Sequence, residues 1–265
     1  GAEGKWVDCD NVRFRYGLPE KIGGWSKVTT DGIIGAVRAS LTYSSLEGVK
    51  YAIYGTNKKL YAYSENNYAD ISPVRASGTG NITQFAVTNG SSTVIVTDAD
   101  HGALIGDFVT ITTVSADVGG ITQANLQNEF EILTVPSTST YTIEAPAAGT
   151  STANGATANA SYQINTRPAT SILGYGWGAG TWGDSTWNSS REGLTGASGV
   201  LLEAGKWTLD SWGEDILSQQ FNGGLFYWDT SAGLSSNRAS TTEVSSAPTK
   251  SRIMLVSGDD RHVIC

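Results

Sequence analysis

The sequence is poor in charged residues, proline and cysteine. Charged residues make up 16% of its 265 positions, against about 25% in an average globular chain. Only 6 prolines are present, which argues against a proline-driven disordered linker. The two cysteines, Cys9 and Cys265, are too few for a disulfide scaffold or a zinc site of the Cys-x-x-Cys type. No apolar run reaches the roughly 18 residues of a membrane-spanning helix, so we expect no membrane span.

Catalytic signatures are also missing. The sequence contains no G-x-S-x-G, no H-E-x-x-H and no P-loop. Asp98, Asp100 and His101 could be read as a metal cluster, but beside Gly102 they are typical turn residues. We therefore predict a non-enzymatic protein with no catalytic residues, no metal site and no cofactor.

What the sequence has in abundance is glycine and β-forming residues. Glycine accounts for 32 positions. Short stretches rich in Val, Ile, Thr, Tyr and Trp alternate with clusters of Gly, Asn and Ser, and no window of 11 residues carries a helical apolar pattern. This arrangement predicts an all-β fold.

The distribution of charge divides the chain into three parts. Residues 76–166 contain seven acidic residues and not one Lys or Arg, whereas both flanks are of mixed charge. We interpret 76–166 as an inserted small β-barrel or β-sandwich domain, between a first part (1–75) and a last part (167–265). Within it, the stretch 147–160 is of low complexity and is expected to be a flexible arm or long loop. Five strands are predicted, at 82–87, 92–97, 107–114, 129–135 and 140–145.

An internal repeat links the two flanking parts. Residues 48–65 align without a gap on 213–230, which places Leu60 on Leu225, and both segments read as strand, turn and strand. The turns are TNKK and FNGG, where Asn and Gly tolerate positive φ. A third copy begins at residue 258, and strand-like stretches precede the copies at 35–43, 206–212 and 251–257. Repeated antiparallel units of this kind predict the blades of a β-propeller-like body, and the alternative is two unrelated hairpins that match by chance.

The two ends of the sequence lead to a further expectation. Its only methionine is Met254, and the last residues, RHVIC, fall within a predicted strand. We therefore expect the chain to be a fragment of a larger protein, with the propeller-like body incomplete and the third copy truncated.

A tryptophan segment lies between the insert and the second copy. Residues 174–188 place Trp177, Trp182 and Trp187 five positions apart among glycines, a spacing that fits neither a strand nor a helix. The three rings are candidates for stacking on sugar faces, or for filling pockets on the propeller or on a neighbouring subunit.

Three segments carry a resemblance to a known family. They are DNVRFRYGLPEKIGGWSK (10–27), GYGWGAGTWG (174–183) and WTLDSWGEDILSQQFNGGLFYWD (207–229). Together they resemble the N-terminal part of virion structural proteins of tailed bacteriophages, the tail hub or nozzle proteins of short-tailed phages. The insert, with 101–111 and 121–135, resembles a small β module found within such proteins.

The resemblance implies a location in the virion tail and a homo-oligomeric ring around the channel through which DNA leaves. It also implies contacts with other tail proteins, such as the adaptor, fibres or spikes, and passage of DNA without specific binding. The net charge of −8 agrees with this expectation, because an acidic lining lowers affinity for phosphate. One alternative is a glycan-binding or receptor-binding virion propeller that uses the tryptophan segment. Another is a glycosidase or sialidase with paired carboxylates.

Overall fold

The structure is a computed structural model that describes residues 9–24, 26–27, 32–166, 204–234, 238–240, 244–260 and 262–265. Residues 1–32 form one compact unit and residues 33–265 form a second. The first unit contains a hairpin of β1 (Val12–Arg15) and β2 (Leu18–Lys21). The described residues contain one helix, α1 (Gln123–Leu126), and none that is long and apolar enough to cross a membrane.

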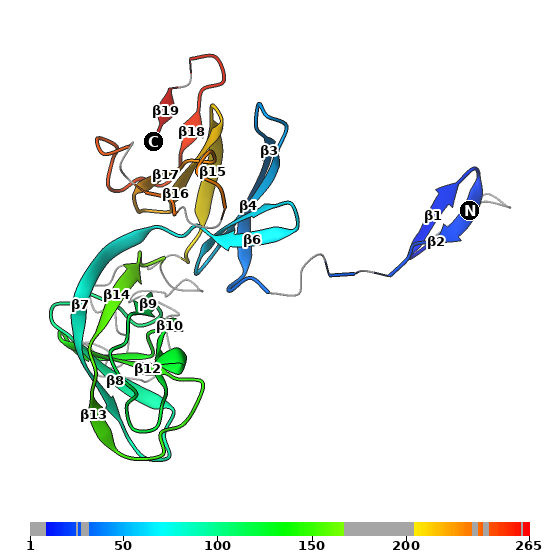
Figure 1. The fold of residues 1–265 in the computed structure, drawn as a ribbon. Helices are drawn as coiled ribbons and strands as arrows, with labels where there is room; N and C mark the ends of the chain where they lie inside the picture. The colour runs from blue at the N-terminus through cyan, green and yellow to red at the C-terminus, as the bar shows by residue number, and fades with distance from the viewer. Residues whose placement is uncertain are drawn as a thin grey trace, which may run out of the picture. The chain divides into compact units, whose positions relative to one another are not determined.

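The first blade is an antiparallel sheet of four strands that are neighbours in the sequence. It is drawn in blue to cyan in Figure 1. Gly48 adopts a φ of +83° in the turn between the first two strands, a conformation that suits glycine. The strands of blade 1 are β3 (Val37–Ser44), β4 (Lys50–Thr56), β5 (Leu60–Ser64) and β6 (Asn67–Asp70).

The second blade repeats this arrangement with β15 (Trp207–Trp212), β16 (Asp215–Gln220) and β17 (Leu225–Trp228). Gly213 takes the place of Gly48, with a φ of +73°. Tyr227 and Ser240 exchange two backbone hydrogen bonds of 2.7 and 2.8 Å, so the segment at Ser240 lies beside β17 as β6 lies beside β5.

The third blade consists of β18 (Leu255–Val256) and β19 (Val263–Ile264), paired antiparallel. Its turn contains Gly258, in the position of Gly48 and Gly213. The body is therefore a row of like blades, and the prediction of an all-β, propeller-like body is confirmed.

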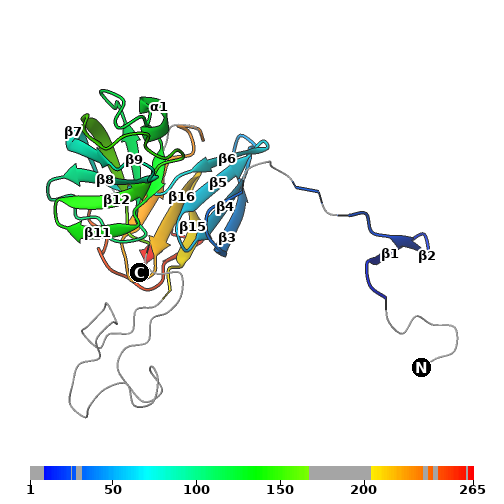
Figure 2. The same ribbon diagram turned by 90° about the horizontal axis from the view of Figure 1, so that it is seen from below.

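Adjacent blades pack face to face, as the strands of blades 1 and 2 show in Figure 2. We call the side of a blade that meets the next blade along the chain its forward face, and the opposite side its backward face. The forward face of blade 1 carries Ile53 and Leu60, which pack on Phe226 and Trp228 from the backward face of blade 2. The forward face of blade 2 carries Leu217, Leu225 and Tyr227, which pack with Met254, Val256 and Val263 of blade 3.

The gap-free alignment of the two hairpins is wrong by one residue in its first strand. Gly55 pairs with Leu60 across four turn residues, whereas Gln219 pairs with Leu225 across five. Leu60 and Leu225 remain equivalent, because both follow the turn and both lie on a forward face. The longer second turn makes Leu217 the counterpart of Ile53.

A second sheet contains all the strands between residues 74 and 163, in the order β10-β9-β14-β7-β8-β12-β11, with β13 on β7. We call it the insert sheet. Its longest strand, β7, pairs first with β14 and then with β8 and β13, so the sheet curls. The strands are β7 (Val74–Val87), β8 (Thr93–Asp98), β9 (Phe108–Thr112), β10 (Glu129–Glu131), β11 (Thr134–Ser137), β12 (Thr140–Glu144), β13 (Ala153–Gly155) and β14 (Ala158–Gln163).

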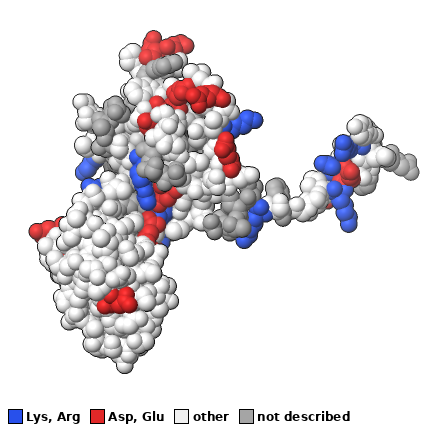
Figure 3. All heavy atoms as spheres, in the orientation of Figure 1, with Lys and Arg blue, Asp and Glu red and all other residues white. Residues whose placement is uncertain are grey.

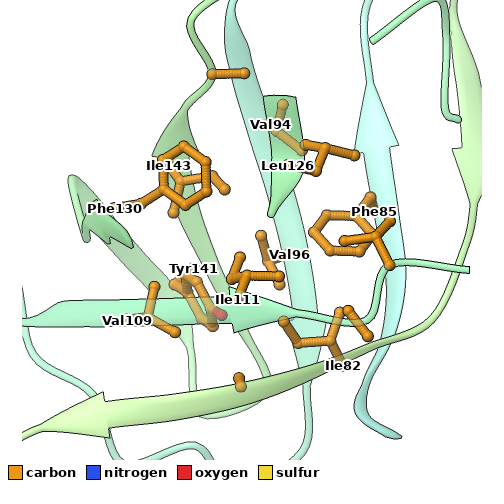
Figure 4. Close-up of a cluster of buried hydrophobic side chains, with 14 of the residues drawn as sticks. Ile82, Phe85, Val94, Val96, Val109, Ile111, Leu126, Phe130, Tyr141 and Ile143 are labelled. Carbon is orange, nitrogen blue, oxygen red and sulfur yellow. The ribbon is translucent and has the colours of Figure 1, made fainter. Parts of the chain in front are cut away.

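The insert sheet wraps around its own hydrophobic core (Figure 4). Alternate residues of β8 point inward, so Val94 and Val96 are buried while Ile95 is 43% exposed. The largest members of this core are Ile82, Phe85, Ile111, Ile121, Leu126, Phe130, Ile132, Tyr141, Ile143 and Tyr162.

Two expectations for the insert are wrong. The stretch 147–160 is not simply an arm or loop, because it holds β13 and the start of β14, which lies between β9 and β7. The strand predicted at 129–135 is two strands, β10 and β11. At the break, Ile132 N donates to Asp107 O (2.8 Å) and Leu133 N donates to Thr142 O (2.9 Å), so the chain passes from one edge of the curled sheet to the other. The boundaries proposed at residues 75/76 and 166/167 stay a prediction.

Candidate functional site

The turn between β4 and β5, residues 56–59, is the point where blade 1, the insert and blade 2 meet. We call these contacts the junction. Every carbonyl group of this turn accepts a hydrogen bond, and a buried carbonyl without a partner would be costly. The donors are Trp207 Nε1 to Thr56 O (3.0 Å), Thr166 Oγ1 to Asn57 O (2.8 Å), Gln163 Nε2 to Lys58 O (2.6 Å) and Thr56 N to Lys59 O (2.8 Å).

Lys59 is the most deeply buried charged side chain of the junction, with 1% of the side chain exposed. Its ammonium group donates to Asp70 Oδ2 of blade 1 at 2.7 Å and to Glu129 Oε2 of the insert. The same ammonium group lies 4.5 Å from the centre of the Phe108 ring on β9. A buried ammonium is tolerated only when it is paired, and here the pairing requires both sheets.

A second lysine and an arginine extend the ionic contacts. Lys58 Nζ lies 2.6 and 2.7 Å from the two carboxylate oxygens of Glu131. Arg238, from the segment beside β17, lies 3.2 Å from Asp70 and 3.9 Å from Glu129. Two acids of the cation-free insert thus bind cations from both blades.

The electrostatics of Asp70 show that these attractions outweigh the cost of burial. Burial alone would raise the pKa of Asp70, but Lys59 and Arg238 hold it below its ordinary value of 3.8. Asp70 also accepts a hydrogen bond from Ser72 N at 2.9 Å. The carboxylate is therefore kept ionised and engaged in the folded protein.

A buried polar cluster lies inside the insert, at the end of β8. Tyr162 donates to Asp98 Oδ2 at 2.5 Å, and Asn81 Nδ2 donates to the same oxygen at 2.8 Å. Burial raises the pKa of Tyr162 and of Tyr141, whose hydroxyl lies 3.2 Å from that of Tyr162. The two phenols therefore stay protonated and act as hydrogen-bonding groups of the core.

His101 belongs to the same cluster and has a defined tautomer. Its Nδ1 accepts a hydrogen bond from Ala103 N at 2.9 Å, which leaves the proton on Nε2, 3.3 Å from Ser137 O. Arg75 donates to His101 O at 3.0 Å and lies 5.1 Å from the centre of the Tyr162 ring. Both ring nitrogens of His101 therefore have protein partners.

Asp107 lies in an environment that is less favourable to its ionised form. It accepts hydrogen bonds from Leu104 N and Asn165 Nδ2, each at 2.9 Å, and lies 3.9 Å from Arg75. Burial nevertheless raises its pKa above the ordinary value. Ionised Asp107 is stabilised less by its partners than the ionised carboxylate of Asp70 is.

The residues that the sequence singled out lie in different kinds of environment. Trp177, Trp182 and Trp187 lie outside the described residues. Asp98 and His101 flank the turn at residues 99–100 and are buried and hydrogen-bonded, while Asp100 lies in that turn and is exposed with a φ of +53°. In the described part of the chain, no group of three or more His, Cys, Asp or Glu residues could hold a metal ion.

Sequence reasoning identified residues 56–59 as a hairpin turn but missed the junction. Its partners lie 70 and 73 positions away in the sequence, at Glu129 and Glu131. Two features of the sequence could have indicated the junction. One is the pair of adjacent lysines in the turn, and the other is the pair of acids at alternate positions of a strand in a segment without Lys or Arg. The arrangement suits a fixed connection between two folded parts, because each cation of the junction has a carboxylate partner.

Comparison with known proteins finds no matching family model and no matching curated protein. Among solved structures, the chain is similar to Phage phi92 endosialidase, with 14% sequence identity and a TM-score of 0.27, over 91% of this chain and 35% of that chain. The chain thus spans about a third of the length of that protein. A likeness of this size carries no argument about function, which rests on the chain's own residues.

Proposed function

We propose that this chain is a non-enzymatic structural subunit of a bacteriophage tail, part of a hub or nozzle ring around the DNA exit channel. The observation that carries the proposal is the row of like blades, in which each blade packs on the next through apolar faces. Blades that bury their apolar faces against like neighbours are the units from which propeller-type rings are built.

The junction supports the same proposal. The buried Lys59 ties the insert to blade 1, and Arg238 ties both to blade 2. Several charge-assisted hydrogen bonds fix the insert on the body, and a part that projects from a virion needs such a fixed attachment. We propose that the insert projects outward from the ring, toward adaptor, fibre or spike proteins.

The charge pattern fits a channel that does not bind DNA. The chain as a whole has a net charge of −8, and on the side shown in Figure 3 the insert, which we place outside the ring, carries few charged side chains. Phosphate affinity of DNA-binding proteins comes mainly from clustered Lys and Arg. A wall with an excess of acids repels the duplex and lets it slide.

Electron microscopy of the purified chain and mass spectrometry of the virion test the proposal. We expect annular oligomers, and peptides of this chain in purified tails. A chain that is absent from purified virions of the phage that encodes it would refute a role in the tail.

The second candidate is a glycan-binding virion propeller, favoured by Trp177, Trp182 and Trp187 in their glycine-rich segment. Aromatic rings on such a segment could stack on the apolar faces of sugars. A glycan array with the wild-type chain and Trp182→Ala, whose folding is checked by circular dichroism, separates the two. Binding that is lost in the variant favours the glycan-binding function, and no binding to any glycan removes it.

A further inference from the structure

Lys59, Asp70 and Glu129 bring an amine and two carboxylates into contact inside the junction. Lys59 Nζ lies 2.7 Å from Asp70 Oδ2 and also donates to Glu129 Oε2. The lysine side chain is 1% exposed, and the Phe108 ring, whose centre is 4.5 Å from Nζ, is itself buried. An amine that touches a carboxyl group away from water is well placed to condense with it, because water is a product of that reaction.

The backbone holds Lys59 and Asp70 beside each other. Lys59 precedes β5, and Asp70 ends β6, the strand paired with β5. Next to them, Ile71 N donates to Leu60 O at 2.9 Å, and Leu60 N donates to Ser72 Oγ at 2.8 Å. Well-oriented groups on rigid elements react with effective concentrations of about 10⁵–10⁸ M. Blade 1 thus supplies the proximity that a condensation of the two side chains needs.

The contacts of the Asp70 carboxyl group suit it as the electrophile. Its Oδ1 accepts a hydrogen bond from Ser72 N at 2.9 Å, and Arg238 Nη1 lies 3.2 Å from its Oδ2. When an amine adds to the carboxyl carbon, negative charge develops on these oxygens, and donors that already point at them stabilise it. Among the described residues, the carboxylate of Glu129 has polar contacts only with the side chains of Lys59 and Arg238. A backbone donor therefore distinguishes Asp70 from Glu129.

The charges of the junction allow the proton transfers that condensation requires. Lys59 and Arg238 balance the two carboxylates, so the set carries no net charge. A proton that passes from Lys59 to Asp70 through Glu129 leaves an amine and a carboxylic acid in contact. Arg238 and the carboxylate of Glu129, 3.9 Å apart, then remain as an ion pair. Because Lys59 and Arg238 lower the pKa of Asp70, the neutral pair is the minor form, and we expect a slow reaction.

We propose that Lys59 and Asp70 form an intramolecular amide bond, with Glu129 as the base that relays the protons. Lys59 Nζ attacks Asp70 Cγ, the Nζ–Cγ bond forms, and the Cγ–Oδ2 bond breaks. Two of the three ammonium protons leave with Oδ2 as water, and the third stays on the amide nitrogen, so no oxidant or other reactant is needed. The step occurs once per chain and joins the turn between β4 and β5 to the end of β6. It does not depend on the proposed role in a tail.

The ion pair of Lys59 and Asp70 is the reactant of this step, and the amide is its product. The amide removes two charges from a site where burial makes them costly. Substitutions at Lys59 measure the strength of the ion pair only in chains that are still unlinked. An intact mass shows which form a sample contains before its unfolding is measured.

Mass spectrometry of the purified full chain tests the bond. After incubation of the folded wild type, its intact mass in denaturant should be lower than the sequence mass by one molecule of water. Trypsin should not cleave after Lys59, and a protease that cuts after Glu65 should leave the peptides of Lys59 and Asp70 joined. A folded wild-type chain with the full sequence mass and a free Lys59 would overturn the proposal. A loss of water that maps elsewhere, such as to Asp31-Gly32, would overturn it as well.

Two matched substitutions test the role of Glu129. Glu129→Gln keeps the size of the side chain and removes the base, and we expect it to slow formation of the bond by about 100-fold or more. Glu131→Gln is the same change two positions away, in the more exposed pair with Lys58, and should leave the rate unchanged. Equal rates in wild type and Glu129→Gln, with folding checked by circular dichroism, would overturn the assignment of the base. Should Glu129→Gln fail to fold, the wild-type masses still decide whether the bond forms.

Discussion

Replacing Lys59 by methionine removes the buried charge of the junction and keeps its apolar stem. Removing one member of a buried ion pair typically costs about 3–5 kcal/mol, because the remaining charge is left buried without a partner. The side chains of Asp70 and Glu129 are 18% and 29% exposed, and Arg238 remains 3.2 Å from Asp70. Partial solvation and the remaining arginine reduce the expected loss of unfolding free energy to about 2–3 kcal/mol.

The adjacent lysine provides the matched control. Lys58 pairs with Glu131, and their side chains are 30% and 38% exposed. Pairs that are this accessible contribute about 0.2–1 kcal/mol, so Lys58→Met should be nearly neutral. The comparison holds the substitution constant and varies the burial of the charge and the number of its carboxylate partners.

Urea unfolding followed by tryptophan fluorescence measures both variants. With a slope of about 2–3 kcal/mol per molar urea, Lys59→Met should lower the midpoint by about 1 M. The double variant Lys59→Met/Glu129→Gln should lose less than the sum of the two single changes, because the contact between them is then removed only once. A midpoint for Lys59→Met equal to that of Lys58→Met would refute the reasoning.

Three other changes test the junction and the packing around it. Because the pKa of Asp70 is lowered from 3.8 on folding, its stabilisation is complete at neutral pH and is lost as the pH falls below about 3.8. Asp70→Asn should therefore flatten the dependence of the urea midpoint on pH between about pH 6 and pH 2.5. Tyr162→Phe removes a donor to Asp98 and should cost about 1–3 kcal/mol of unfolding free energy. Gly55→Ala would bring a Cβ within 2.7 Å of Trp207 Cβ and should cost about 1–3 kcal/mol by overpacking.

Two control substitutions accompany these changes. Tyr63→Phe removes an exposed hydroxyl whose hydrogen bond goes to Asn66, and should alter the unfolding free energy by less than about 0.5 kcal/mol. Gly155→Ala adds a Cβ that meets no atom within 4 Å, so it should not show the loss expected for Gly55→Ala. A loss in either control as large as in its counterpart would contradict the assigned causes.

The all-β class and the repeated hairpins could be predicted because both depend on local sequence. Alternation along a strand such as β8 and Asn-Gly or Asn-Lys turns leave a signal within ten residues. The register could not be predicted to the residue, because an extra turn residue before Leu225 changes the partners of β16 without changing its pattern. The sequence of β16 is therefore compatible with either register against β17.

The start of β14 was missed for a different reason. Its buried residues Ala158 and Ala160 are small, because the strand lies between β7 and β9 over the packed core. Small residues in a stretch of Thr, Asn and Gly look like low complexity. Their role as close-packing positions follows only from neighbours that lie about 50 to 80 positions away.

The charge segregation of the sequence favours the contact that the insert makes with blade 1 at the junction. Its seven acids have no Lys or Arg within 76–166 to pair with, so their cationic partners must come from outside this stretch. Glu129 and Glu131 are two positions apart on β10, which places both on one face of the strand. Lys58 and Lys59, adjacent in a turn, can reach these two carboxylates together. Opposite charges thus favour one orientation of the insert on blade 1, and the absence of cations within the insert removes internal pairings that would compete with it.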